Sequence, residues 1–264
     1  MRFLMRAILP FTIVFLMTFG GAYLPPMEFD DGPSVLIVGD RGYETVNDAL
    51  RYAEPDDIIR VRPGVYTDPV VIDKSVKIFG SGPMTIYTST LIVSANDVTL
   101  TGHTFQDIYD NTTIHDWDFG GIVTRQPDGP ISDNWISRLT VSYCTFRNNR
   151  QGVFLFGAKN SVVTNCDFYN SFRGVSIGPH YIGTAIVWSS SGNTVSNNNF
   201  YGMVGDGCLD GDAIGIWDSN YNTVTGNTMD GNSYGVTISE GVGNTVTGNT
   251  ITNSTYHAIN LLSQ

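Results

Sequence analysis

The residues of this sequence that are best suited to chemistry are acids, one arginine and one histidine in its second half. Asp206, Asp210 and Asp212 lie close together, and paired carboxylates can act as general acid and base on a glycosidic bond. Arg173 supplies a fixed positive charge and His180 a base that titrates near neutral pH. We predict catalytic roles for Asp210, Asp212, Arg173 and His180. As an alternative, Asp206, Asp210 and Asp212 hold Ca²⁺ through their hard oxygen atoms.

Aromatic side chains accompany these charged groups and offer faces on which sugar rings can stack. The predicted substrate-binding residues are Tyr181, Trp188, Trp217, Tyr234 and His257. Two plainer interpretations stay open. The Asp-Gly pairs of this region are common turn sequences, and an exposed ion pair between Arg173 and Asp212 would contribute little.

A repeat of 22 residues must position these groups. One copy reads Leu139-x-Val141-x-x-Cys144-x-Phe146, and further copies begin at Ser161, Asn193, Asn222 and Asn244. A small residue and an alternating apolar pair follow each copy, as in Gly152-Val153-x-Leu155. The alternation predicts short strands with one buried face. Because so short a unit cannot bury its own face, the units must stack, and we predict an all-β fold, a parallel β-helix.

Stacking of equivalent positions predicts two rows of side chains. An interior row holds Phe146, Phe168, Phe200, Met229 and Ile251. A turn row holds Cys144, Cys166, Asn198, Asn227 and Asn249, where amides can bond to one another and to the turn backbone. The two cysteines are either small buried side chains or a disulfide between neighbouring coils.

Four insertions interrupt the repeat, at about 106–120, 125–138, 178–191 and 201–212. They flank the strand that carries the small residue, so we predict a groove with that strand as its floor. The first floor row is Gln151, Arg173, Asp212, Tyr234 and His257; the next rows are Phe154, Ser176, Gly215, Thr237 and Asn260, then Phe156, Gly178, Trp217, Ser239 and Leu262. This register places Asp212 one coil from Arg173 and one coil from Tyr234.

The first half begins with a short amphipathic helix over Thr45–Ala53, which we expect to cover the N-terminal end of the coil. Asp56-Asp57-Ile58-Ile59-x-Val61-x-Pro63-Gly64 and the strands after it resemble the opening of pectin-lyase-like proteins. The resemblance extends over about residues 34–264 and includes pectinesterases, NosD-type proteins and exported β-helix repeat proteins. It implies a right-handed solenoid, here of about eight coils. This superfamily includes lyases, hydrolases, epimerases, esterases and adhesins, so the resemblance is specific for fold alone.

Charge and the N-terminus indicate where the protein works and what it binds. The formal charge is −11, and no Lys or Arg follows Arg173, which excludes a nucleic-acid binder of ordinary type. The same asymmetry favours a neutral glycan, or an anionic one bridged by Ca²⁺.

Residues 1–22 read as a signal peptide or a membrane anchor, with the apolar stretch at 7–24, and residues 23–33 read as a linker to a single domain over 34–264. We therefore expect a secreted, periplasmic or cell-surface protein.

Three functions fit these observations. The first is a carbohydrate-active enzyme, a polysaccharide lyase, glycoside hydrolase or epimerase. The second is a non-catalytic surface β-helix that binds a glycan or a partner. The third is a NosD-like metal-associated protein, which four His and three Cys disfavour. The repeat continues to Leu261-Leu262 with no capping segment, so we also expect self-association or a partner at the last coil.

Overall fold

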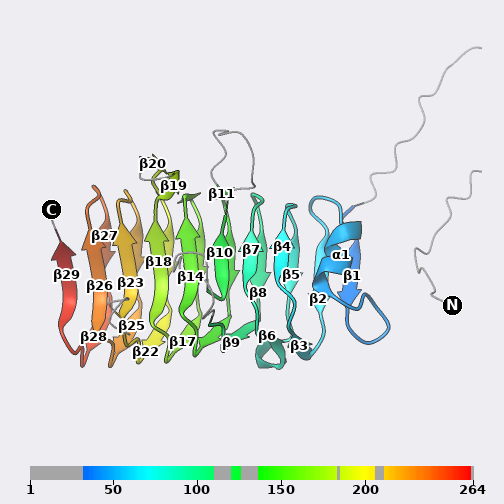
Figure 1. Cartoon of the computed structure of the whole chain (residues 1–264), viewed down its shortest axis with the longest axis horizontal. Helices are drawn as coiled ribbons and strands as arrows, with labels where there is room; N and C mark the ends of the chain where they lie inside the picture. Colours follow the sequence, from blue (N-terminus) through cyan, green and yellow to red (C-terminus); the bar gives the residue numbers. More distant parts are fainter. Residues whose placement is uncertain (1–31, 110–119, 126–135, 183–184, 206–210, 263–264) are drawn as a thin grey trace, which may run out of the picture. The chain divides into compact units, whose positions relative to one another are not determined.

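Short parallel strands alternate with tight turns throughout the computed structural model, which describes residues 32–109, 120–125, 136–182, 185–205 and 211–262. Each turn of the coil contributes one strand to each of three parallel sheets, which run along the coil axis (Figure 1). The molecule is therefore a parallel β-helix, and eight coils contribute described strands to two of the sheets.

The three sheets have the following strands. Sheet A contains β1 (Val35–Val38), β2 (Ile58–Val61), β5 (Lys77–Phe79), β8 (Thr99–Thr101), β12 (Thr140–Ser142), β16 (Val162–Thr164), β21 (Thr194–Ser196), β24 (Thr223–Thr225) and β27 (Thr245–Thr247). Sheet B contains β3 (Gly64–Tyr66), β6 (Thr85–Tyr87), β9 (Thr104–Gln106), β13 (Thr145–Arg147), β17 (Asp167–Tyr169), β22 (Asn199–Tyr201), β25 (Thr228–Asp230) and β28 (Thr250–Thr252). Sheet C contains β4 (Val70–Ile72), β7 (Leu91–Val93), β10 (Ile122–Thr124), β14 (Gln151–Phe156), β18 (Arg173–Gly178), β23 (Asp212–Trp217), β26 (Tyr234–Ser239) and β29 (His257–Leu262).

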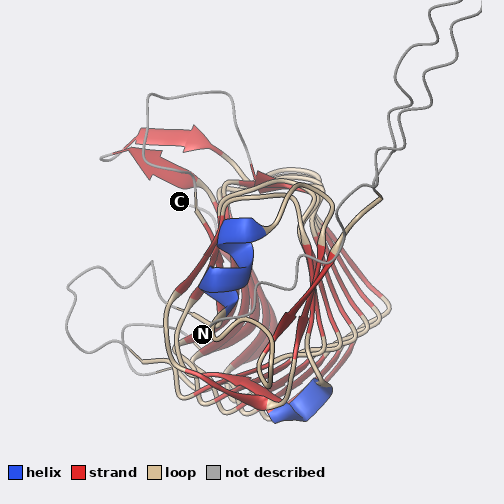
Figure 2. Ribbon diagram, turned by 90° about the vertical axis from the view of Figure 1, so that its right-hand side faces the viewer, coloured by secondary structure: helices blue, strands red, loops and turns tan. Residues whose placement is uncertain are grey.

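Smaller elements lie outside the three long sheets. The strands β11 (Ile136–Ser137) and β15 (Ala158–Lys159) pair in parallel, and a 3₁₀ turn η1 spans Gly82–Met84. The strands β19 (His180–Ile182) and β20 (Ala185–Trp188) form an antiparallel hairpin. This hairpin projects from one corner of the coil in the view along its axis (Figure 2).

A column of aromatic rings fills the interior and confirms the predicted stack. The rings of Phe146 and Phe168 are 4.7 Å apart, and those of Phe168 and Phe200 are 4.6 Å apart, nearly parallel in both pairs. Met229 and Ile251 continue the column in the next two coils. Phe105 and Tyr87 extend it in the other direction. Each ring is buried on both faces by its equivalents, so register and burial reinforce each other.

The predicted asparagine ladder is also present. The side-chain Oδ1 of Asn227 accepts from the backbone N–H of Asn198 (3.0 Å), and its Nδ2 donates to the backbone O of Val195 (2.9 Å). Asn249 repeats the first bond with Asn227 (2.9 Å). The residue before each ladder position has a φ between 53° and 66°, at Tyr143, Asn165, Asn197, Gly226 and Gly248. Asparagine and glycine tolerate this left-handed conformation better than most residues.

Two further ladders, which the sequence analysis did not predict, occupy the other corners. Ser161, Asn193, Asn222 and Asn244 form one of them, and Asn149, Ser171 and Asn232 contribute equivalent bonds at the third corner. Each side chain accepts a backbone N–H from the preceding coil. These backbone N–H groups of the buried turns are therefore satisfied without water.

The cysteine row contains free thiols. Cys144 and Cys166 are both buried and unbridged, and the backbone N–H of Cys144 points at the Cys166 Sγ (3.5 Å). Burial raises the pKa of the Cys166 thiol well above its ordinary value, so this residue stays protonated. Both side chains occupy positions that asparagine holds in later coils, which fits small buried residues and not the alternative of a disulfide.

The helix α1 (Val46–Tyr52) begins at the N-cap Thr45, whose Oγ1 accepts from the backbone N–H of Asp48 (3.0 Å). It buries Val46, Ala49 and Leu50 and lies across the N-terminal end of the coil (Figure 2), as predicted. Lys74 Nζ donates to two carbonyl groups at the end of the helix. No helix within the described ranges is long and apolar enough to cross a membrane.

The last coil, formed by β27, β28 and β29, exposes apolar side chains. Leu261 is 72% exposed, and Ile259 and Leu262 are about half exposed. Self-association or a partner at this coil stays a prediction, and so do the domain boundaries. Residues 1–22 and most of the linker lie outside the described residues.

Candidate functional site on sheet C

The three outward rows of sheet C have the predicted register. Gln151 pairs with Arg173, Asp212 with Tyr234, and Tyr234 with His257. Ser176, Gly215 and Thr237 follow one another in the middle row, and Trp217 pairs with Ser239 in the third. The long strands of this sheet thus bring together side chains that lie up to 106 positions apart in the chain, from Gln151 to His257.

A buried ion pair occupies the centre of this face. Arg173 Nε lies 3.4 Å from Asp212 Oδ2, and Thr237 donates to Asp212 Oδ1 from the next coil. The side chain of Arg173 is 6% exposed and that of Asp212 is 0% exposed. The outward face expected to be an open floor is therefore covered at these two residues. The ion pair of Arg173 and Asp212 is buried, so it is not the weak surface ion pair that one interpretation allowed.

Trp217 lies against this pair. The guanidinium carbon of Arg173 is 4.4 Å from the centre of the Trp217 ring, within the range of a cation–π contact. The indole folds back along its own strand over Gly215, where any Cβ would collide with the ring. Trp217 remains partly exposed, so one fixed aromatic surface reaches solvent.

A second polar pair lies one coil earlier. Ser176 Oγ donates to Gln151 Oε1 (2.8 Å), and both residues are buried. The Gln151 Nε2 group has no hydrogen-bond partner among the described atoms.

The aromatic surface continues toward the C-terminal coils. Tyr234, partly exposed, stacks on Tyr256 with a centroid distance of 5.2 Å, and His257 lies 6.0 Å from the Tyr234 ring. Tyr256 is 62% exposed. The sequence analysis missed Tyr256, because the repeat register holds no floor row at its position. Its place directly before the floor residue His257 was the available signal.

Several predicted site residues lie in parts of the chain that the structure does not describe. Asp206 and Asp210 lie outside the described residues, and so do the side chains of His180, Tyr181 and Trp188. The backbone places His180 opposite Trp188 in the β19–β20 hairpin. The predicted calcium site is left with Asp212 alone in the described part, and Asp212 is already engaged by Arg173 and Thr237. In the ranges that the structure describes, no three His, Cys, Asp or Glu side chains are grouped as a metal site requires.

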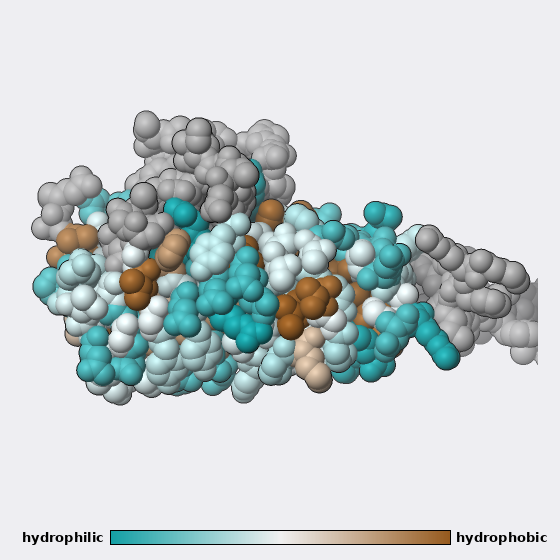
Figure 3. All heavy atoms as spheres, turned by 60° about the horizontal axis from the view of Figure 1, so that its bottom comes forward, coloured by the Kyte–Doolittle hydropathy of each residue, from teal (hydrophilic) through white to brown (hydrophobic). Residues whose placement is uncertain are grey.

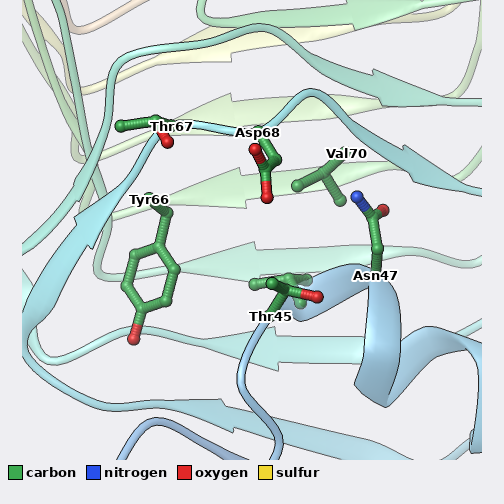
Figure 4. Close-up of a pocket in the computed structure, with 7 residues that line it drawn as sticks. Thr45, Asn47, Tyr66, Thr67, Asp68 and Val70 are labelled. Atoms are coloured by element: carbon green, nitrogen blue, oxygen red, sulfur yellow. The ribbon is translucent and has the colours of Figure 1, made fainter.

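Two other surfaces provide a comparison. On sheet B the rings of Tyr169 and Tyr201 stack on each other at 5.5 Å, as Tyr234 and Tyr256 do on sheet C, but no tryptophan contact like that of Trp217 with Arg173 is found beside them in the described residues. Figure 3 shows that the face carrying sheet B is mostly hydrophilic, with separate apolar patches. A pocket at the N-terminal end, lined by Thr45, Asn47, Tyr66 and Asp68 among others, has a cavity volume of about 20 Å³ (Figure 4). This volume is below the ~300 Å³ at which ligand pockets usually begin.

Comparison with known proteins supports the fold. The family model "Right handed beta helix region" matches residues 74–209, just over half of the chain. A second model, "Periplasmic copper-binding protein (NosD)", matches residues 179–264. No curated protein matches the chain in sequence.

Three solved structures are similar to this chain. The catalytic domain of Agl-KA superposes with a TM-score of 0.55 at 15% identity, over 78% of this chain and 38% of that chain. PfbA, a surface adhesin of Streptococcus pneumoniae, gives 0.56 at 14% identity, over 77% of this chain and 56% of that chain. An alginate lyase from Paenibacillus sp. has a TM-score of 0.49 at 11% identity, over 88% of this chain and 98% of that chain. The matched region thus spans less than two thirds of the length of the first two proteins. Identities this low establish the fold alone.

The two histidines whose side chains are described lie in different coils. His103 is buried in the turn ladder, and His257 stands beside two tyrosines on sheet C. The stacked parallel sheets, the inward aromatic column and the match over 74–209 agree, and the chain belongs to the right-handed β-helix family.

Proposed function

We propose that this chain is an exported β-helix protein that binds a polysaccharide along the outward face of sheet C. The binding surface consists of Trp217, Tyr234, Tyr256 and His257, called here the aromatic row. The observation that carries the proposal is the fixed indole of Trp217, which is held by Arg173 and Gly215 and yet reaches solvent.

The buried ion pair supports a positioning role for Arg173 and Asp212. Removing two charges from water costs several kcal/mol per ion, so such a pair is weak evidence for stability. The ion pair is not required for the coil to form, since other coils have Gln151 or Tyr234 at the equivalent position. Its local effect is to fix the guanidinium against the indole, which pre-orders the aromatic surface before a ligand arrives.

Binding is favoured over catalysis by the state of Asp212. Its carboxylate is 0% exposed, accepts from Thr237 and faces Arg173. A general acid or base must come within hydrogen-bond reach of the substrate. The described carboxylate of this site is turned toward its own protein partners instead.

Partly exposed aromatic rings with polar groups beside them suit sugar rings better than they suit apolar ligands. PfbA, which has the same fold, is a surface adhesin, and this supports a binding role. Export is supported by the basic start and apolar run of residues 1–22 and by the match of 179–264 to a periplasmic family.

The proposal is tested by affinity electrophoresis against a panel of neutral and acidic polysaccharides, with and without Ca²⁺. We expect retention by at least one polysaccharide. Trp217→Ala should weaken that retention about tenfold, which corresponds to loss of one good ring contact. The matched control is Tyr169→Ala, which removes a partly exposed ring from sheet B and should leave retention unchanged.

Each panel sample is also assayed for product. Retention without product supports binding as the function. New reducing ends or unsaturated sugars would assign catalysis, and Asp212→Ala would then separate a catalytic from a positioning role. Absence of retention by every polysaccharide, or equal losses in both variants, would refute the proposed site.

A further inference from the structure

Negative charge borders the aromatic row. Asp218 follows Trp217 directly, and the pairing of Trp217 with Ser239 places Glu240 beside Asp218 in the next coil. The backbone N–H of Asp218 donates to Ser239 O (3.0 Å), which holds the two turns together. The two carboxyl groups share a hydrogen bond, which together with the charge of Asp218 raises the pKa of Glu240.

The same surface has no positive charge to offer a ligand. Arg173 is the nearest cation, and its charge is offset by Asp212 at 3.4 Å. No Lys or Arg occurs anywhere in the sequence after Arg173, so the only residues after it that can carry a positive charge are His180 and His257. A ligand lying on Trp217, Tyr234 and Tyr256 thus meets carboxylates on one side and no guanidinium or ammonium group on the coils beneath it.

We infer that the aromatic row selects uncharged glycans and excludes polyuronates. The inference rests on the proposed function and specifies the substrate class of the same site. Like charges that meet across an interface disfavour binding, whereas the neutral hydroxyl groups of an uncharged sugar meet no such opposition. Many β-helix surfaces could bind either class, so the distinction comes from Asp218, Glu240 and the neutralised Arg173.

The test uses pairs of polymers that share a backbone and differ in charge. Suitable pairs are methyl-esterified and de-esterified polygalacturonan, β-mannan and polymannuronate, and an α-glucan with its carboxylated derivative. For the backbone that binds, calorimetry at low salt should give an affinity for the neutral member at least about tenfold higher. Raising the salt concentration to about 1 M should bring the neutral-to-anionic affinity ratio closer to one, because exposed charges are then screened within ~3 Å.

A double variant shows whether the acids set the ratio. Asp218→Asn with Glu240→Gln should lower the neutral-to-anionic affinity ratio by several-fold. The control, Asp167→Asn with Asp230→Asn, makes the same change in net charge on sheet B and should leave the ratio as in the wild type.

The outcomes separate this inference from the proposed function. Equal or tighter binding of the anionic member by the wild type, with Trp217→Ala still weakening it, overturns the charge selection and keeps the aromatic row. The same fall in the ratio for both double variants also overturns it, because net charge would then explain the effect. Loss of binding to every polymer overturns the proposed function and the inference with it.

Discussion

His103 links the turn ladder to the pH dependence of stability. It holds the ladder position that Cys144 and Asn198 hold in later coils, and its Nε2 lies 3.2 Å from the carbonyl O of Ile78. The residue is 2% exposed, and its Nδ1 has no partner among the described atoms. Burial lowers the pKa of His103 to about 4, because the interior disfavours the charged ring.

The sign and size of the effect follow from this shift. Above pH 6.5 the ring is neutral in both the folded and the unfolded chain and contributes nothing to the pH dependence. Between pH 6.5 and about 4 the unfolded chain binds a proton that the folded chain does not, so the free energy of unfolding falls as the pH falls. The full loss is about 3 kcal/mol, at roughly 1.4 kcal/mol per pH unit between the two pKa values. Below about pH 4 this loss levels off.

The assay is urea unfolding of the wild type and His103→Asn at several pH values from 7.5 to 4. Asparagine can donate to Ile78 O as the other ladder amides donate to their carbonyl groups, and it does not titrate. Carboxylates shared by both proteins affect both curves equally. We expect the wild type to lose about 3 kcal/mol more than the variant over this range. Parallel curves would refute the account of His103 as a buried neutral ring.

Three other substitutions test the coil and the site. Asn227→Ala leaves the buried N–H of Asn198 and O of Val195 unpaired and should cost about 3 kcal/mol by urea unfolding; a cost below 1 kcal/mol would show that the ladder is incidental. Phe168→Ala opens a cavity between Phe146 and Phe200 and should cost ~3–5 kcal/mol, and a wild-type urea midpoint would contradict the packed column. Gly215→Ala should displace the Trp217 ring, shift its fluorescence relative to a Trp217→Phe reference, and weaken glycan binding about tenfold while costing roughly 1–3 kcal/mol of stability. Unchanged fluorescence there would mean that the indole does not rest on Gly215.

The repeating part of the fold could be predicted from the sequence because each coil imposes the same constraint on the next. One alignment of the copies placed Phe168 between Phe146 and Phe200 and placed Asn198 beside Asn227. It also placed Asp212 between Arg173 and Tyr234. The ladder through Ser161 and Asn193 has the same spacing as the predicted one, so the same alignment could have found it. In the third ladder, Met203 stands between Ser171 and Asn232 and breaks the run of polar residues.

Burial on the outward face could not be predicted, since it depends on what covers a strand and not on its register. Arg173 and Asp212 occupy the expected row, yet they are enclosed, whereas His257 in the same row is exposed. The fold of Trp217 over Gly215 is likewise a rotamer choice that the alternation of residues does not encode. Tyr256 lies outside the rows and joins the site through its stacking on Tyr234.

The central claim, that the aromatic row on sheet C binds sugar rings, is tested most directly by a crystal structure with a bound oligosaccharide. The oligosaccharide is taken from the polysaccharide that the panel retains. The account predicts sugar rings against Trp217 and the Tyr234–Tyr256 pair, with Arg173 and Asp212 unmoved. Sugar bound on sheet A or sheet B, with Trp217 free of contact, would contradict it.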